Sequence, residues 1–139
     1  MKKIIFQKAE NNFTIIIFGA SGSLAKLKLF PSIYQLAAED RLPRDYKIFG
    51  YGRSEISNED FREFFRKSVM ERTEHVDEQK IDLLLKNIFY VSGQYNEKKD
   101  FQKLRTTLDQ VEKNKNRIRI AYFSVPPSAF TEIFENLAA

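Results

Sequence analysis

The sequence predicts an α/β fold, in which a parallel β-sheet carries helices on both faces. Short apolar runs rich in β-branched and aromatic residues alternate along the chain with amphipathic segments of helical period. The first apolar run leads through a glycine turn into a helix-like segment, and no internal repeat breaks the alternation. Strands that are separated by helices form βαβ units, and such units require parallel strands.

Each expected element has its own pattern. Continuous apolar runs, typical of strands buried on both faces, predict strands at residues 14–18, 46–51, 88–91 and 118–125. Apolar residues at spacings of three and four predict helices at residues 23–40, 57–69, 79–86, 101–111 and from 128 onward. Pro31 is expected to kink the first helix or to open a second one. Ser57, with Asp60 three residues later, predicts an N-cap.

The composition excludes several classes of protein. The chain has 139 residues, a net charge of +4 and no cysteine. The absence of cysteine excludes a disulfide scaffold, a thiolate metal site and a cysteine nucleophile, and we assign no metal site. No apolar run is long enough for a membrane span, and the apolar start at Met1–Phe6 is too short for a secretory signal, so we expect a cytoplasmic protein. The basic stretch at 113–119 lacks interleaved aromatic residues and predicts a solvated loop, not a nucleic-acid site.

The strand at 14–18 ends in a two-glycine turn, Gly19-Ala20-Ser21-Gly22-Ser23-Leu24. Glycine allows a tight turn and a close approach of a ligand to the backbone, and the helix start that follows offers unpaired N–H groups and a positive dipole end. A pyrophosphate suits such a place. Two interpretations remain open on these residues: a dinucleotide-binding loop of the Rossmann type, and a purely structural turn. A nucleoside-triphosphate loop is excluded because no Gly-Lys-Ser/Thr follows.

The second strand ends in Gly50-Tyr51-Gly52-Arg53-Ser54. Units that bind NAD usually place an acid here to hold the ribose hydroxyls, whereas an arginine accommodates the 2′-phosphate of NADP. Arg53 can grip a phosphate and stack on adenine, because its guanidinium is planar and always charged. The position therefore favours NADP over NAD, with a solvated surface arginine as the alternative.

These segments resemble the glucose-6-phosphate dehydrogenases. Residues 19–31 are similar to the nucleotide-binding motif of that family, Gly-Ala-Ser-Gly-Asp-Leu-Ala-Lys-x-Lys-hydrophobic-Tyr/Phe-Pro. The likeness continues in order at Leu42-Pro43, at residues 50–53, at residues 90–95 and at Val125-Pro126-Pro127. It covers nearly the whole chain.

The resemblance implies an oxidoreductase of glucose metabolism and the pentose phosphate pathway. The full-length enzyme would oxidise glucose 6-phosphate to the 6-phosphoglucono-lactone with hydride transfer to NADP, NAD being a weaker alternative. Residues 1–139 would form the N-terminal part of a Rossmann-type, doubly wound NADP-binding domain, with about four of six strands in the order 3-2-1-4. The last helix has no cap, and we expect the C-terminal domain for substrate binding and homo-oligomer formation to be absent.

The resemblance also assigns residues. The cofactor-binding set would be Gly19, Ala20, Ser21, Gly22, Ser23, Leu24, Arg53, Tyr95, Val125, Pro126 and Phe130. Among these, the first six form the pyrophosphate loop, Arg53 contacts the 2′-phosphate and adenine, and the last four line the coenzyme cleft. Lys28 matches the family's lysine on the floor of the active site, between coenzyme and sugar phosphate.

The chain departs from the family pattern in two respects. Ser23 stands where the motif has an acid, and Phe130 where some relatives have Tyr; we expect Ser23 to cap the helix, so that the loop survives. The family's Glu-Lys-Pro segment, its sugar-phosphate segment and its catalytic His–Asp pair are missing. We therefore assign no catalytic residue and expect this chain alone to be inactive. The only histidine, His75, is expected at the surface.

Two other hypotheses compete. Tyr95 and Lys99 satisfy the Tyr-x-x-x-Lys pattern of short-chain dehydrogenases, but they follow the third strand instead of lying on a later helix. The chain could also act as a stand-alone nucleotide-binding or interaction module without catalysis. An open edge at the fourth strand would then make it prone to self-association.

Overall fold

The computed structural model describes residues 11–138 and confirms the α/β prediction. The four strands are all parallel and lie in the predicted order β3-β2-β1-β4. They are β1 (Phe13–Phe18), β2 (Tyr46–Gly52), β3 (Ile88–Ser92) and β4 (Ile118–Phe123). β4 ends two residues before the predicted position, because Ser124 and Val125 belong to a turn that packs on Gly19. The segment Met1–Phe6 lies outside the described residues.

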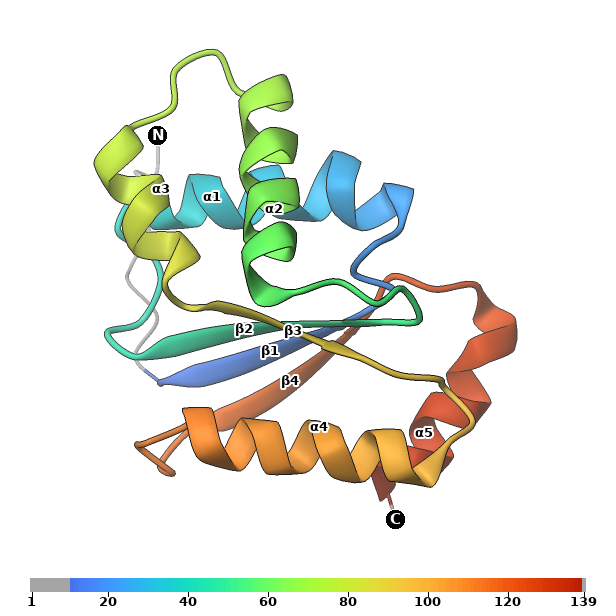
Figure 1. Ribbon diagram of the computed structural model, residues 1–139. Helices are drawn as coiled ribbons and strands as arrows, with labels where there is room; N and C mark the ends of the chain where they lie inside the picture. Colours follow the sequence, from blue (N-terminus) through green and yellow to red (C-terminus); the bar gives the residue numbers. More distant parts are fainter. Residues whose placement is uncertain (1–10, 139) are drawn as a thin grey trace, which may run out of the picture.

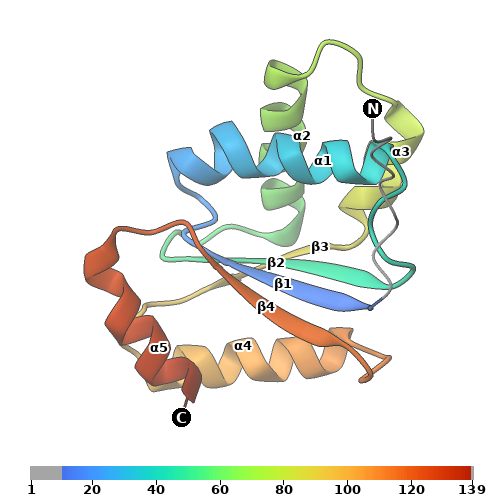
Figure 2. The same cartoon turned by 180° about the vertical axis from the view of Figure 1, so that it is seen from behind.

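Helices cover both faces of the sheet, as predicted (Figure 1). One face carries α1 (Phe30–Ala38), α2 (Asn58–Arg72) and α3 (Glu78–Leu85); the other carries α4 (Lys98–Val111) and α5 (Phe130–Ala138). Two short turns, η1 (Ala25–Leu29) and η2 (Pro127–Ala129), precede α1 and α5. The view from behind shows β4 at the free edge of the sheet (Figure 2).

Alternation along the strands produces two apolar cores, one on each side of the sheet. On β1, Ile17 packs into the core beneath α1, α2 and α3, whereas Ile16 and Phe18 pack into the core above α4 and α5. Successive side chains of a strand point to opposite faces, so a strand buried on both faces reads as an unbroken apolar run. This explains why β1 could be recognised from its residues.

The segment predicted to be helical from residue 23 to residue 40 has unbroken helical backbone from residue 23 to residue 38, and it changes from π to α geometry at Phe30, next to Pro31. The residues before it form the π-helical turn η1, in which the N–H of Phe30 donates to the carbonyl of Ala25, five residues back. Proline has no N–H to donate to a carbonyl of the preceding turn, so it sits where α1 starts. The predicted N-cap of α2 is confirmed, since the Ser57 hydroxyl accepts the N–H of Asp60 at 3.0 Å.

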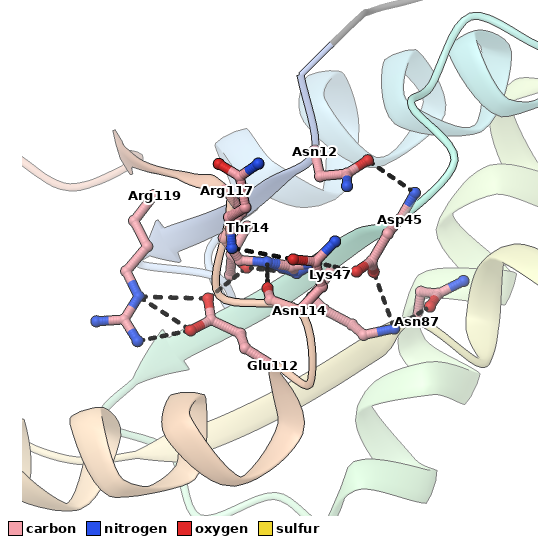
Figure 3. Close-up of polar contacts among 10 residues, drawn as sticks. Asn12, Thr14, Asp45, Lys47, Asn87, Glu112, Asn114, Arg117 and Arg119 are labelled. Carbon is pink, nitrogen blue, oxygen red and sulfur yellow. Dashed lines mark hydrogen bonds and ion pairs between the residues drawn. The ribbon is translucent and has the colours of Figure 1, made fainter.

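A polar network closes the amino edge of the sheet, where all four strands begin (Figure 3). The residues directly before the strands are Asn12, Asp45, Asn87 and Arg117. The Asn12 side chain accepts the N–H of Asp45 at 3.2 Å, and the nearly buried Arg117 forms an ion pair with the Asp45 carboxylate. Lys47 bridges Asp45 and Asn87. Side chains thus hold the strand starts in register from β3 to β4.

Glu112, at the end of α4, joins this network from below the sheet. Its carboxylate is 1% exposed, accepts the Thr14 hydroxyl at 2.6 Å and receives two nitrogens of Arg119 at 2.6 and 3.1 Å. Burial raises the pKa of Glu112, but the bonds from Arg119 and Thr14 and the charges of Arg119 and Arg117 outweigh it, and the pKa is lowered overall. The charged form is therefore stabilised by the fold.

This geometry predicts an acid-dependent loss of stability. The folded pKa of Glu112 lies below its usual value, so its contribution is present in full above about pH 4.5 and is lost as the pH falls through the folded pKa. We expect Glu112→Gln to lower the free energy of unfolding at pH 7 by about 1.5–3 kcal/mol, with a smaller difference at pH 3. Urea unfolding across this pH range measures it.

Asp109→Asn is the matched control, because Asp109 contacts the same Arg119 at 2.9 Å but is exposed. It should change stability by about 0–1 kcal/mol. A Glu112→Gln protein whose stability follows the wild-type pH curve at constant offset would contradict the prediction.

The free edge of β4 exposes apolar side chains. Ile118, Ile120 and Tyr122 are each between 41% and 51% exposed. Tyr122 lies beside Ile17 in the register, so the three point to the face of α1, α2 and α3, whose helices lie over the other strands (Figure 2). An apolar strand with unpaired backbone groups is a template for pairing.

We therefore expect the 139-residue chain to associate at high concentration, and Ile120→Lys to shift it toward the monomer, because a charge on the edge opposes pairing. Sedimentation over a range of concentrations measures this. Leu83→Lys adds the same charge at an exposed leucine of α3 and should leave association unchanged. Equal effects of the two variants would speak against the β4 edge.

Candidate functional site

The residues assigned from the sequence gather at the carboxyl edge of the sheet, opposite the polar network. The loop after β1, the segment after β2, the loop after β3 and the turn after β4 all emerge there (Figure 1). In open α/β sheets, ligands bind outside the carboxyl ends of the strands where the strand order reverses, here between β1 and β4. The topology therefore puts the glycine loop at the expected position.

Gly19 is held in a conformation and a space that suit only glycine. Its φ is +84°, and a Cβ there would lie 2.2 Å from the carbonyl oxygen of Ser124 and 2.7 Å from Cγ1 of Val125. Its N–H and that of Ala20 both donate to the carbonyl of Tyr51, at 2.9 and 3.3 Å. The loop is thus fixed to β2 on one side and to the turn after β4 on the other.

The second half of the loop is open to solvent. The N–H of Gly22 donates to the carbonyl of Gly19 at 3.0 Å, helical backbone starts at Ser23, and Gly22, Ser23 and Leu24 are all exposed. The first N–H groups of a helix lack partners within it, so this start can receive an anion. A Cβ on Gly22 would meet only the Gly19 oxygen, at 3.3 Å.

The prediction that Ser23 caps the helix was wrong. The N-cap position of η1 is Leu24, whose φ of −63° and ψ of −45° are already helical, and no side chain caps it. Ser23 lies inside helical backbone, where its hydroxyl is not placed to accept an N–H two or three residues on. The loop keeps its shape through the backbone bonds of Gly19, Ala20 and Gly22 instead.

Arg53 follows β2 directly and is exposed. Its backbone is bracketed by two fixed carbonyls: that of Gly52 accepts the N–H of Gly93 at 2.9 Å, and that of Ser54 accepts the hydroxyl of Tyr90 at 2.6 Å. Among the described residues no carboxylate forms an ion pair with Arg53, and the neighbouring Glu55 is exposed. The guanidinium is therefore available to an anion at this edge.

Tyr95 lies in the loop between β3 and α4, beside Gly19 and within electrostatic reach of Arg53. Burial raises the pKa of Tyr95, while the Arg53 charge and the Gly19 backbone act in the opposite direction without cancelling it. Its backbone is held by Asn136 of α5, whose amide donates to the Tyr95 carbonyl at 2.8 Å. Tyr95 lies in this loop and Lys99 in the first turn of α4, so the two residues do not lie together on a helix, which argues against the Tyr95–Lys99 hypothesis.

The turn after β4 supplies the remaining predicted residues. Val125 is half-buried against Gly19, Pro126 is exposed, and Phe130 packs its ring 5.2 Å from that of Phe123. The structure thus brings this turn against the glycine loop. Phe130 is the first residue of α5, and its contact with Phe123 packs this helix against the end of β4, at the border of the site.

Two residues of this region were not assigned any role from the sequence. The hydroxyl of Ser124 is buried and has no hydrogen-bond partner among the described residues. The hydroxyl of Tyr90, which reaches the site from β3, meets both Ser54 and Ser21. In the sequence each is an ordinary residue of an apolar run. Its possible role follows only from the neighbouring loops that approach it in the fold.

Other polar candidates lie apart from the loop. Lys28 is exposed on η1, and its carbonyl accepts the Ser32 hydroxyl at 2.8 Å. His75 is exposed in the segment that links α2 to α3, and this segment lies at the end of α2 that points away from the sheet (Figure 1). Within residues 11–138 no cluster of three or more His, Asp or Glu side chains is placed to hold a metal ion, and none of the described helices is long and apolar enough to cross a membrane.

These features fit a dinucleotide. At Gly19 any Cβ would meet the Ser124 backbone, and the Ser124 hydroxyl is a buried polar group without a partner among the described residues. The exposed helix start can accept a pyrophosphate. A strand, a glycine turn and a helix start at the switch point of a parallel sheet define a dinucleotide-binding domain of the Rossmann type.

Comparison with known proteins identifies the family. Residues 16–139 match the family model described as glucose-6-phosphate dehydrogenase, NAD binding domain, and the chain belongs to this family. A chloroplastic glucose-6-phosphate 1-dehydrogenase of Arabidopsis thaliana is 37% identical over 91% of this chain, and glucose-6-phosphate 1-dehydrogenase of Saccharomyces cerevisiae is 36% identical over 94%. The chain spans 22% and 26% of these two proteins, or about a quarter of their length.

Solved structures agree. A glucose-6-phosphate dehydrogenase in complex with its substrate glucose 6-phosphate superposes with a TM-score of 0.82 at 34% identity, over 96% of this chain and 28% of that one. The enzyme from Mycobacterium avium, 24% identical, shares the fold with a TM-score of 0.79, over 94% of this chain and 27% of that one.

Alanine substitutions at the two loop glycines are predicted to have different effects on stability and on dinucleotide binding. Gly19→Ala adds a positive-φ penalty of about 1–2 kcal/mol and a clash with the Ser124 backbone, so both the free energy of unfolding and dinucleotide binding should fall. Gly22→Ala meets only a contact of 3.3 Å and should leave stability within about 0.5 kcal/mol, while its methyl group obstructs a ligand on the exposed backbone. Thermal unfolding and calorimetric titration with NADP separate the two.

Equal losses of stability in both variants would contradict this assignment. So would NADP binding by the Gly22→Ala protein with the wild-type affinity.

Proposed function

We propose that this chain is the NADP-binding part of a glucose-6-phosphate 1-dehydrogenase. Its family membership supports the enzyme class, and one observation supports NADP in particular: Arg53 stands exposed at the end of β2, next to the glycine loop. In this position an acid would select the ribose hydroxyls of NAD, and an arginine accommodates a 2′-phosphate. The nearest acid, Glu55, lies two residues further on.

Residues at the carboxyl edge of the sheet would each bind a different part of the coenzyme. The exposed helix start at Ser23 and Leu24, next to Gly22, receives the pyrophosphate, because the first N–H groups of a helix and its dipole favour an anion there. Arg53 grips the 2′-phosphate. Tyr95 and the turn at Val125 and Pro126, which both lie against Gly19, would contact the rest of the coenzyme.

In the whole enzyme, C1 of glucose 6-phosphate would lose its hydride to NADP and its hydroxyl proton to a general base, giving the lactone. NADP supplies the hydride acceptor, and the protein orients it. Lys28 would contact the sugar phosphate or the coenzyme from η1. The chain's only histidine, His75, is exposed away from the loop, so a base from outside these residues is needed and the chain alone should be inactive.

The remaining assignments belong to the whole protein. A homo-oligomer would form through a C-terminal domain, as the expected domain division implies. A cytoplasmic location remains part of the proposal; the relatives from Arabidopsis thaliana and Spinacia oleracea are named chloroplastic.

The decisive experiment is a calorimetric titration of the purified chain with NADP and NAD, repeated with Arg53→Ala. A charge-assisted hydrogen bond contributes about 1.5–3 kcal/mol. The variant should therefore bind NADP about 10- to 100-fold more weakly, whereas NAD loses only the adenine contact and should weaken far less. Arg44→Ala, which removes an exposed arginine from the amino side of β2, is the matched control and should change neither.

Three outcomes would overturn the proposal. These are no binding of either dinucleotide, equal loss of both in Arg53→Ala, or reduction of NADP by glucose 6-phosphate with this chain alone.

A further inference from the structure

The Tyr90 hydroxyl lies where three segments of the carboxyl edge meet. Tyr90 is on β3, is 7% exposed and packs its ring 4.8 Å from that of Phe61. Its hydroxyl donates to the carbonyl of Ser54 at 2.6 Å. Ser54 directly follows Arg53, so this bond fixes the chain next to the guanidinium that would receive the 2′-phosphate.

The same hydroxyl also reaches the glycine loop. Oγ of Ser21 lies close to this hydroxyl, and this polar neighbour lowers the pKa of Tyr90 against the larger increase that burial causes. A Cβ on Gly52 would lie 2.9 Å from the Tyr90 hydroxyl and 3.1 Å from Oγ of Ser21, so both oxygens pass over the Gly52 backbone. A side chain at position 52 would separate the loop from β3.

The tyrosine is itself firmly held. Its N–H donates to Oδ1 of Asn58 at the start of α2, at 2.7 Å, and it pairs with Gly50 in the ladder between β2 and β3. The N–H of Gly93, on the same strand end, fixes the carbonyl of Gly52. Hydrogen bonds from the end of β3 therefore hold the residues on both sides of Arg53, namely Gly52 and Ser54. The bond to Ser54 comes from a side-chain hydroxyl, which a single substitution can remove.

We propose that Tyr90 is a positioning residue that sets the spacing between the glycine loop and Arg53, and thereby the preference for a dinucleotide that carries a 2′-phosphate. The inference rests on the proposed NADP function. NADP engages the loop and Arg53 at once, so its affinity depends on their separation. NAD engages the loop without the Arg53 phosphate contact, so it depends on this separation far less.

Tyr90→Phe removes the hydroxyl and keeps the ring that packs on Phe61. We expect about a five- to tenfold loss of NADP affinity, less than a twofold change for NAD, and hence a lower ratio of the two affinities. Without any ligand, hydrogen exchange should become faster at the amides of the glycine loop and of residues 53–55. Calorimetry measures the first effect and mass spectrometry of exchanged peptides the second.

Tyr34→Phe is the matched control. Tyr34 is 2% exposed, and its hydroxyl accepts the N–H of Asp77 at 2.8 Å, between α1 and the start of α3. It removes a comparable buried bond elsewhere in the molecule. It should alter overall stability without changing the ratio of NADP to NAD affinity or the exchange of the loop.

A second variant tests whether the two segments are coupled. If Ser21 and Ser54 are coupled through the Tyr90 hydroxyl, Ser21→Ala should accelerate hydrogen exchange at residues 53–55. Ser21 lies in the loop after β1, whereas these residues follow β2. The double variant with Tyr90→Phe should then show less than the product of the single effects.

The outcomes separate this inference from the function on which it rests. If the wild-type chain binds neither dinucleotide, the proposed function fails, while the exchange measurements still decide whether Tyr90 joins the segments. If the wild type prefers NADP and Tyr90→Phe keeps both the affinity ratio and the exchange pattern, the function stands and the inference is wrong. Equal effects in Tyr34→Phe would also overturn it.

Discussion

At the carboxyl end of β1 the chain passes through a space that has no room for a side chain. Gly19 lies between the Tyr51 carbonyl, which accepts its N–H, and the Ser124 carbonyl, which a Cβ would meet at 2.2 Å. β1 is also the strand that pairs with both β2 and β4. The absence of a side chain at Gly19 therefore lets the carboxyl ends of β1, β2 and β4 lie close together. The loops that carry the candidate site follow these strand ends.

The ends of the sheet have different roles: the amino ends of the strands carry paired charges that stabilise the fold, and the carboxyl ends carry the candidate binding site. At the amino edge, charged groups are paired and each pair has one buried partner: Arg117 pairs with Asp45, and Glu112 with Arg119. At the carboxyl edge, Gly22, Ser23 and Arg53 are exposed, and the charge of Arg53 has no carboxylate partner among the described residues. A parallel sheet has both kinds of edge by construction, because all its strands begin on one side and end on the other. Fixing the starts in register makes it possible to leave the ends open for a ligand.

Much of the fold could be predicted because the strands carry the information locally. An apolar run such as Thr14–Phe18 has few alternatives to a buried strand, and the helical spacing of Phe61, Phe65 and Val69 identifies a buried face. What could not be predicted depends on contacts between distant residues. The burial of Glu112 follows from Thr14, ninety-eight positions earlier, and nothing in the local sequence distinguishes it from a solvated acid at a helix end. The cap expected at Ser23 failed because Ser23 already has helical backbone, and the loop is held instead by backbone bonds to the distant Tyr51, which the local sequence does not reveal.

An acid in place of Ser23, as in the motif that residues 19–31 resemble, would act on affinity through its charge and not through the fold. A carboxylate at an exposed helix start would repel a pyrophosphate in the same place, and it would also weaken the positive end of the dipole. Serine removes both effects and adds a neutral hydroxyl on a backbone that does not need it as a cap. Since the loop is held by the N–H groups of Gly19, Ala20 and Gly22, Ser23→Asp should raise the free energy of unfolding by no more than about 0.3–1 kcal/mol, through the helix dipole. Any change in dinucleotide affinity would then report on charge at the helix start alone.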